Sequence, residues 1–267
     1  MNLHTLILTK NDCYKAGETI TPKGIMIHST GANNPWLKRY VGPDDGLIGA
    51  NQYGNHWNTA RPGGRQICAH AFIGRLKDGS IATYQALPWN MRGWHAGGSA
   101  NNTHIGIEIC EDGLNDSSYF SAVYKEAVEL CVYLCKQYGL TEKNIICHSE
   151  GHAQGIASNH GDVMHWFPKH GKSMDTFRAD VKAALGDDKA DNVIAGFKPY
   201  RVRVNITNLN IRKGPGTNYA PNGNYTGRGV FTIVEEADGA GAAKWGLLKA
   251  YMKSRSGWIS LDHTVKV

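Results

Sequence analysis

The sequence contains no apolar run close to the roughly 18 residues that a membrane-spanning helix requires. Its first ten residues also lack the basic start and the continuous apolar stretch of a secretory signal peptide. The six cysteines include no CxxC pair, which argues against a thiolate zinc site or a redox motif. We therefore expect no insertion into a membrane, synthesis in the cytoplasm without a leader, and cysteines that remain buried free thiols.

Acidic residues are scarce in the last quarter of the chain. Residues 196–267 hold 11 lysines and arginines against 4 aspartates and glutamates, whereas residues 1–195 hold 18 against 19. A basic segment suits an anionic partner such as nucleic acid, lipid or a wall polymer. Because this segment contains neither a run of lysines nor a helix-turn-helix pattern, we expect no nucleic-acid partner.

The first part of the chain combines short apolar runs with helical patterns, which predicts an α/β domain. The expected helices cover residues 118–138 and 174–185, and each is followed by a glycine that ends it. Short apolar runs bounded by Gly, Asn or Pro are expected to be strands, at residues 24–28, 67–73, 81–85, 104–110 and 144–147.

The pattern changes after residue 186. Residues 187–192 are polar and lack periodicity, so we expect a linker at 187–197 between a catalytic domain at 1–186 and a second domain at 198–267. The second domain is expected to be a small all-β barrel, because turns rich in Gly, Asn and Pro separate its short alternating runs. These runs cover residues 200–204, 209–212, 230–235, 245–250 and 257–261.

Histidine is abundant, with eleven of the twelve histidines before residue 171. His28 and His148 each end a predicted strand, where a sheet gives way to the loops that commonly carry functional sites. A catalytic zinc ion needs three protein ligands and an open fourth position. A third ligand is available downstream in Asp162, with His160 and His165 as alternatives.

A carboxylate interrupts the apolar strand predicted at residues 104–110. Glu108 is costly to bury unless it has a partner or a function, which makes it a candidate base; at the edge of a sheet it would simply face water. His70 and His95 lie near the ends of other elements and are candidates for lining the same cleft. His148 and His152 form a rival metal pair at helical spacing. The spacing alone is compatible with a zinc hydrolase and leaves the reaction open.

Several ordered segments resemble the type 2 N-acetylmuramoyl-L-alanine amidase family, which shares its fold with peptidoglycan recognition proteins. The resemblance covers roughly residues 20–182. It implies a mixed central β-sheet flanked by helices, and one Zn²⁺ in a groove that binds the glycan–peptide junction of peptidoglycan. The segments are Ile25-Met-Ile-His-Ser-Thr-Gly31, Cys68-Ala-His-Ala-Phe-Ile-Gly74, Gly93-Trp-His-Ala-Gly97, Ile105-Gly-Ile-Glu-Ile109 and Ile146-Cys-His-Ser-Glu150.

The resemblance also implies roles for individual residues. His28 and His148 correspond to the two histidine ligands of zinc, and Asp162 falls where the family has its third ligand. Glu108 corresponds to the catalytic glutamate, and His160 stands where many members have a lysine that stabilises the oxyanion. The remaining residues expected to bind the substrate are His70, Trp94, His95 and Asn102.

Two positions depart from the family pattern. His160 replaces the lysine, although a protonated imidazole can also stabilise an oxyanion, and Val163-Met164 replace the usual Pro-Gly. We expect hydrolysis of the amide bond between N-acetylmuramic acid and L-alanine, with Glu108 as general base. The alternatives are a non-catalytic peptidoglycan recognition module and a zinc peptidase that cuts within the stem peptide.

The last part of the chain resembles bacterial SH3 (SH3b) wall-binding modules, chiefly in Leu209-Asn-Ile-Arg-Lys-Gly-Pro-Gly216. Tyr219, Trp245 and Trp258 are expected to contact the wall, although both tryptophans are equally well explained as barrel core. A wall-binding tail without a signal peptide is typical of a phage or prophage endolysin, or of an autolysin. We expect a monomer that reaches a Gram-positive wall through a holin or after lysis.

Overall fold

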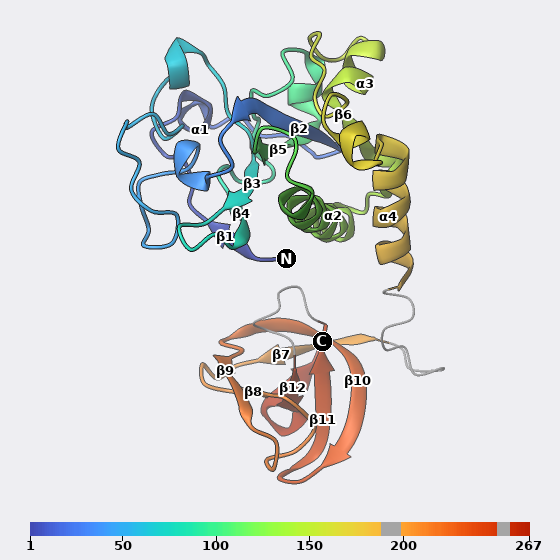
Figure 1. Cartoon of the computed structure of the whole chain (residues 1–267). Coiled ribbons are helices and arrows are strands. Elements are labelled where there is room, and N and C mark those ends of the chain that lie inside the picture. Colours follow the sequence, from blue (N-terminus) through green and yellow to red (C-terminus); the bar gives the residue numbers. More distant parts are fainter. Residues whose placement is uncertain (188–198, 250–256) are drawn as a thin grey trace. The chain divides into compact units, whose positions relative to one another are not determined.

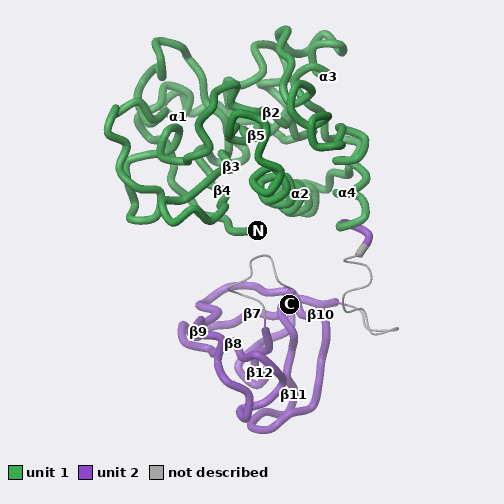
Figure 2. Tube along the Cα trace, in the orientation of Figure 1, with its two compact units in different colours: residues 1–184 green, residues 185–267 purple. Residues whose placement is uncertain are grey.

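The computed structural model describes residues 1–187, 199–249 and 257–267, which form two compact units, Met1–Ala184 and Leu185–Val267 (Figure 2). The linker expected at 187–197 lies, apart from residue 187, outside the described residues. All six cysteines are buried and free, as expected. Within the described ranges, no helix is long and apolar enough to cross a membrane.

Unit 1 is a mixed β-sheet with helices packed against it (Figure 1). Its strands are β1 (Leu3–Thr5), β2 (Gly24–Asn33), β3 (Ala71–Arg75), β4 (Ile81–Gln85), β5 (His104–Glu111) and β6 (Ile145–Cys147). Its helices are α1 (Asp12–Ala16), α2 (Ser117–Tyr138), α3 (His148–Ala153) and α4 (Met174–Asp187). The strand order is β1-β4-β3-β5-β2-β6, in which β3 and β4 are antiparallel and the other neighbours parallel. The predicted fold class is confirmed.

In unit 1, two of the predicted strands differ from their predicted bounds by more than one residue. β2 continues past His28 to Asn33, with an irregular register against β5 after Ser29. β3 begins at Ala71, because Cys68 pairs with Trp94 in an isolated bridge outside the strand. β1 lies outside the predicted elements, since three residues are too short to show an alternating pattern.

α2 is the helix with the clearest sequence signals. The Asp116 side chain accepts hydrogen bonds from two backbone N–H groups of the first turn. At the other end Gly139 has the left-handed conformation, with φ 67°, and ends the helix as predicted. The apolar face of α2 packs on β3 and β4, and its Phe120 packs on Trp166. This packing fixes the helix against the sheet that carries β5.

Unit 2 is a seven-stranded antiparallel sheet, consistent with the expected SH3-like barrel (Figure 1). Its strands are β7 (Tyr200–Val204), β8 (Asn210–Arg212), β9 (Pro221–Tyr225), β10 (Gly229–Gly239), β11 (Ala242–Leu248), β12 (Trp258–Ser260) and β13 (Thr264–Lys266). Their order is β13-β7-β10-β11-β12-β8-β9. The inward side chains form one apolar core that includes Val202, Val204, Ile211, Ile233 and Ile259.

The three aromatic residues expected to contact the wall differ in exposure. Tyr219 is 44% exposed, and Trp258 is partly buried. Trp245 is only 2% exposed, and it lines a cavity of about 340 Å³ in unit 2. The role of these three residues in wall binding remains a prediction.

Candidate metal and catalytic site

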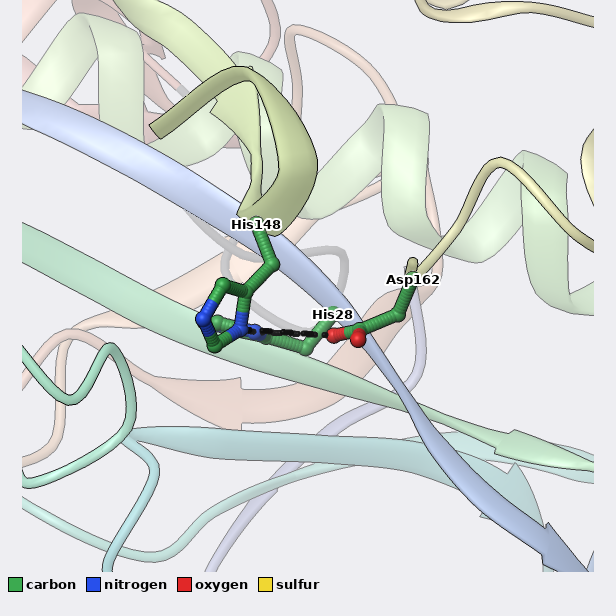
Figure 3. Close-up of side chains that lie close together, drawn as sticks. All are labelled: His28, His148 and Asp162. Atoms are coloured by element: carbon green, nitrogen blue, oxygen red, sulfur yellow. Dashed lines mark hydrogen bonds and ion pairs between the residues drawn. The ribbon is translucent and has the colours of Figure 1, made fainter. Parts of the chain in front are cut away.

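Three side chains from separate parts of unit 1 converge on one point (Figure 3). His28 lies in β2, His148 is the first residue of α3, and Asp162 lies in the segment after α3. Nδ1 of His28 is 3.1 Å from Oδ2 of Asp162 and 3.1 Å from Nδ1 of His148. The third separation, from Nδ1 of His148 to Oδ2 of Asp162, is 3.6 Å. A tetrahedral zinc ion with bonds of about 2.0–2.1 Å holds its ligands about 3.4 Å apart, so these donors fit one cation.

The sheet register explains how two distant histidines meet. β2 lies between β5 and β6, and Ile27 of β2 pairs with Cys147 of β6. His148 therefore follows at the point where β6 ends beside His28. On the other side His28 pairs with Glu108 of β5, which puts these two side chains on the same face of the sheet, one strand spacing of about 4.8 Å apart.

Burial and hydrogen bonding shift the pKa values of two members of the cluster, His28 and Asp162. His28 and His148 are 1% and 3% exposed, and burial lowers the pKa of His28. Burial alone would raise the pKa of Asp162, but hydrogen bonds to His148 and His28 outweigh it and hold this pKa well below its usual range. Imidazole nitrogens and a carboxylate oxygen are a suitable donor set for a divalent cation.

Glu108 is a partly buried carboxylate without a hydrogen bond to its inner oxygen. Oε2 is buried and has no partner among the described residues. Burial raises the pKa of Glu108 to about 8, and the nearby charges of Asp162 and Glu111 contribute. β5 lies between β3 and β2, so the alternative of a glutamate on an edge strand is excluded. An unpaired carboxyl in this position is a candidate general base.

The cluster and Glu108 open onto one cavity of about 520 Å³. His160 lies at its wall, exposed and stacked on His148 with ring centroids 4.7 Å apart. Trp94 and His95 line the same space. The cavity is also lined by Ser29, Thr30, Gly31, Trp57, Arg65, Gln66, Ile67, Gly97 and Ser158.

The alternative ligands lie outside the three-residue cluster. Nε2 of His165 is 2.9 Å from Oε1 of Glu111, with which it forms an ion pair when protonated. His152 is exposed, and its Nδ1 lies 3.3 Å from the carbonyl oxygen of Ala157. Among the described residues, the group suited to a metal ion consists of the two histidines and Asp162.

Two residues expected to bind the substrate do not line the cavity. His70 is fully buried, its Nε2 lies 2.7 Å from the carbonyl oxygen of Met91, and its Nδ1 accepts the Gly106 N–H at 3.0 Å. Both ring nitrogens are therefore occupied, and His70 is a structural residue. Asn102 accepts a hydrogen bond from Nε of Arg92 at 2.6 Å and lies outside the cavity wall. Both expectations are corrected.

The sequence patterns missed the loop before β3. Trp57, Arg65 and Ile67 line the cavity of about 520 Å³ and also a neighbouring cavity of about 390 Å³, to which Arg39 contributes. Trp57 and Arg65 stand in an irregular stretch without alternation or helical spacing. The turn-rich Arg-Pro-Gly-Gly-Arg at residues 61–65 is its strongest local signal, and this indicates a loop without indicating a binding surface.

A comparison with protein families decides the assignment of unit 1. The Amidase_2 model, described as N-acetylmuramoyl-L-alanine amidase, matches residues 18–163, which is more than half of the chain. The chain belongs to this family. The matched range contains His28, Glu108, His148 and Asp162 and ends before unit 2. Membership of the amidase family confirms the resemblance of the first part, whereas the SH3b resemblance of unit 2 remains a prediction.

Individual relatives of this amidase-family chain match it over shorter stretches or at low identity. N-acetylmuramoyl-L-alanine amidase XlyA of Bacillus subtilis (strain 168) is 40% identical over 68 residues, which are 24% of this chain and 22% of that protein. The chain therefore spans about a fifth of the length of this curated relative.

Solved structures were also compared. PlyL has a TM-score of 0.48 at 19% identity, and the match covers 68% of this chain and 96% of PlyL. The catalytic domain of XlyA has a TM-score of 0.47 at 24% identity, with 68% and 99% covered. Staphylococcus aureus hydrolase AmiA, in complex with its ligand, has a TM-score of 0.49 at 15% identity, with 71% and 84% covered. At these values the family assignment depends on the family model.

Proposed function

We propose that unit 1 is a zinc-dependent N-acetylmuramoyl-L-alanine amidase that cleaves the bond between N-acetylmuramic acid and L-alanine of the stem peptide. The observation that carries this proposal is the His28, His148 and Asp162 cluster, with donor atoms 3.1–3.6 Å apart, beside the unpaired carboxyl of Glu108. All four residues lie in the range matched by the amidase family.

The chemistry divides between the cation and the side chains around it. Zinc at the cluster would supply a Lewis acid for the carbonyl of the scissile amide and for the attacking water. Glu108 takes a proton from that water and returns it to the L-alanine nitrogen as the carbon–nitrogen bond breaks. His160, exposed on the cavity wall, donates a ring N–H to the oxygen that becomes negative.

Glu108 must be ionised to act as the general base at neutral pH, so its raised pKa has to be lowered. Its value of about 8 applies to the protein without a cation, where burial favours the neutral carboxyl. A divalent charge at the neighbouring cluster would lower the pKa, because opposite charge stabilises the carboxylate. Glu108 would then be ionised at neutral pH and able to accept a proton.

The proposal is tested by incubating purified Gram-positive peptidoglycan with the full chain and following new amino groups and new reducing sugars separately. An amidase releases amino groups without reducing sugars, and a chelator stops the release until Zn²⁺ is added back. Retention of the protein on intact wall without new amino groups would favour the alternative of a recognition module.

We further propose that unit 2 binds the cell wall through its exposed aromatic surface. The ring of Tyr219 packs directly on Gly214. A Cβ added at this glycine would lie 2.5 Å from the ring. Its carbonyl oxygen accepts a hydrogen bond from Nη1 of Arg212 at 2.8 Å. Arg212 also lines a cavity of about 340 Å³ in unit 2. An aromatic ring that is fixed in place near the guanidinium of Arg212 is suited to binding a peptide or glycan of the wall.

Replacement of Tyr219 by alanine is expected to weaken binding of the full chain to purified wall about two- to twelvefold, because the ring contact contributes about 0.5–1.5 kcal/mol. The measurement is a sedimentation binding curve with a chelator present to prevent hydrolysis. Tyr53→Ala is the matched control, since Tyr53 is an 85% exposed tyrosine of unit 1. Equal binding by both variants would contradict the role of Tyr219.

A further inference from the structure

Each histidine of the proposed metal site has a hydrogen-bonding partner on the side of its ring away from the cluster. Both rings turn Nδ1 toward the cluster. Nε2 of His28 lies 3.0 Å from Nδ1 of His95, and Nε2 of His148 lies 3.1 Å from Oγ of Ser158. The direction of these two hydrogen bonds decides whether each Nδ1 has a lone pair free for a cation.

The hydrogen bond between His95 and the carbonyl of His104 determines the direction of the bond between His28 and His95. Nε2 of His95 lies 3.0 Å from the carbonyl oxygen of His104, which can only accept, so this nitrogen carries the hydrogen. In a neutral imidazole the hydrogen on Nε2 is the only ring hydrogen, so Nδ1 of His95 is the acceptor for Nε2 of His28. His28 must therefore donate from Nε2, and in the metal-bound chain its Nδ1 would carry the lone pair directed at the cation.

The hydrogen bond from Ser158 to the carbonyl of Ala96 determines the direction of the bond between His148 and Ser158. Oγ of Ser158 lies 3.2 Å from the carbonyl oxygen of Ala96 and donates its hydroxyl hydrogen to it. The same oxygen can then only accept from Nε2 of His148. In the metal-bound chain Nδ1 of His148 would then carry a lone pair, so both histidines would direct a lone pair at the same point.

One short segment supports both hydrogen-bond chains. Residues 93–97 contribute the ring of His95 to the first chain and the carbonyl of Ala96 to the second. The side chain of Asn101, 2% exposed, accepts the backbone N–H groups of both residues at 2.9 and 2.8 Å. An added Cβ at Gly106 would lie 2.3 Å from the His95 ring, so a glycine is needed behind it.

We propose that His95 and Ser158 are positioning residues that fix both ligand histidines in the Nε2–H tautomer, with the segment 93–97 as their common support. This inference rests on the proposed metal site. It replaces the expected role of His95 in substrate binding, because both nitrogens of its ring are already occupied. Partners of this kind orient metal ligands, and their loss costs about 10–100-fold in metal affinity.

The test is the dissociation constant for Zn²⁺, measured on the full chain by competition with a chromogenic chelator. His95→Phe keeps the ring but removes the acceptor, so the affinity is expected to fall about 10–100-fold. His95→Asn places a carbonyl oxygen near the position of Nδ1 and is expected to restore most of the affinity. Ser158→Ala is expected to weaken binding in the same way as His95→Phe. His152→Ala, next to the site but outside both chains, should bind as the parent does.

A second readout is the tautomer itself, from two-bond nitrogen–proton correlations of the histidine rings in the zinc-loaded chain. The expected spectrum has the proton of His28 and His148 on Nε2. A proton on Nδ1 of either ring, or unchanged zinc affinity in a folded His95→Phe variant, would overturn the proposal. Neither readout uses a wall substrate, so a chain that binds zinc in this way and cuts no wall would contradict the amidase proposal alone.

Discussion

Glu108→Gln is expected to lower the turnover of peptidoglycan about 10²–10⁴-fold and to leave zinc affinity nearly unchanged. The amide keeps the size of the side chain but cannot take a proton from water. Glu108 stands beside His28 in the register of β2 and β5 but is not one of the three side chains grouped as metal donors. The measurement is the initial rate of amino-group release, together with zinc content after dialysis.

Glu111→Gln is the matched control for this substitution. Glu111 lies on the same strand and is 5% exposed, but its carboxylate is paired with His165 and with the backbone of Gly31. We expect this variant to lose some stability and to keep most of its turnover. Full lytic activity in Glu108→Gln would show that Glu108 is not the base.

Glu108→Gln is also expected to change how the free energy of unfolding of the metal-free protein depends on pH. Burial, followed by Asp162 and Glu111, raises the pKa of Glu108 to about 8 in the folded state, against about 4.3 in an unfolded chain. The native state therefore holds a proton that the unfolded chain releases, so stability is greatest below the lower pKa and falls as the pH rises toward the higher one. The slope is at most about 1.4 kcal/mol per pH unit. Urea unfolding with a chelator present should lose this slope in Glu108→Gln.

Asp162→Ala is expected to lower zinc affinity by at least about 100-fold and to abolish turnover with it, because it removes one of three ligands. His165→Ala removes one of the two alternative candidates, whose ring binds Glu111, and should keep zinc. Competition with a chelator measures both variants under one condition.

A normal affinity in Asp162→Ala, or a lost affinity in His165→Ala, would contradict the assignment of the third ligand. The comparison is informative because the two residues are only three positions apart in the chain. Any general disturbance of this loop would affect both variants, whereas loss of a ligand affects one.

The spacing of apolar residues and the positions of Gly, Asn and Pro predicted much of the fold. The spacing indicates which side chains are buried, and the Gly, Asn and Pro residues indicate where an element ends. α2 begins one residue before its predicted start and ends at its predicted residue, Tyr138, and β4 has its predicted ends. The same patterns placed His28 and His148 near the ends of neighbouring strands. Sequence order does not reveal that β2 lies between β5 and β6, which is what brings the two rings together.

The residues around the ligands could not be assigned from sequence. His70 and His95 occur in similar contexts near the ends of elements, yet one is locked between Met91 and Gly106 and the other supports His28. Which two side chains form a hydrogen bond depends on their contact in the folded chain. Such a contact produces no periodic pattern in the sequence. Ser158 illustrates this, since its role depends on the carbonyl of Ala96, sixty-two residues earlier.

The central claim is the bond that is cut, and the most direct test is mass spectrometry of soluble products from purified Gram-positive peptidoglycan, with and without a chelator. We predict free stem peptides that begin with L-alanine, absent in chelator and restored by Zn²⁺. Stem peptides shortened internally and still attached to N-acetylmuramic acid would identify a peptidase and contradict the account.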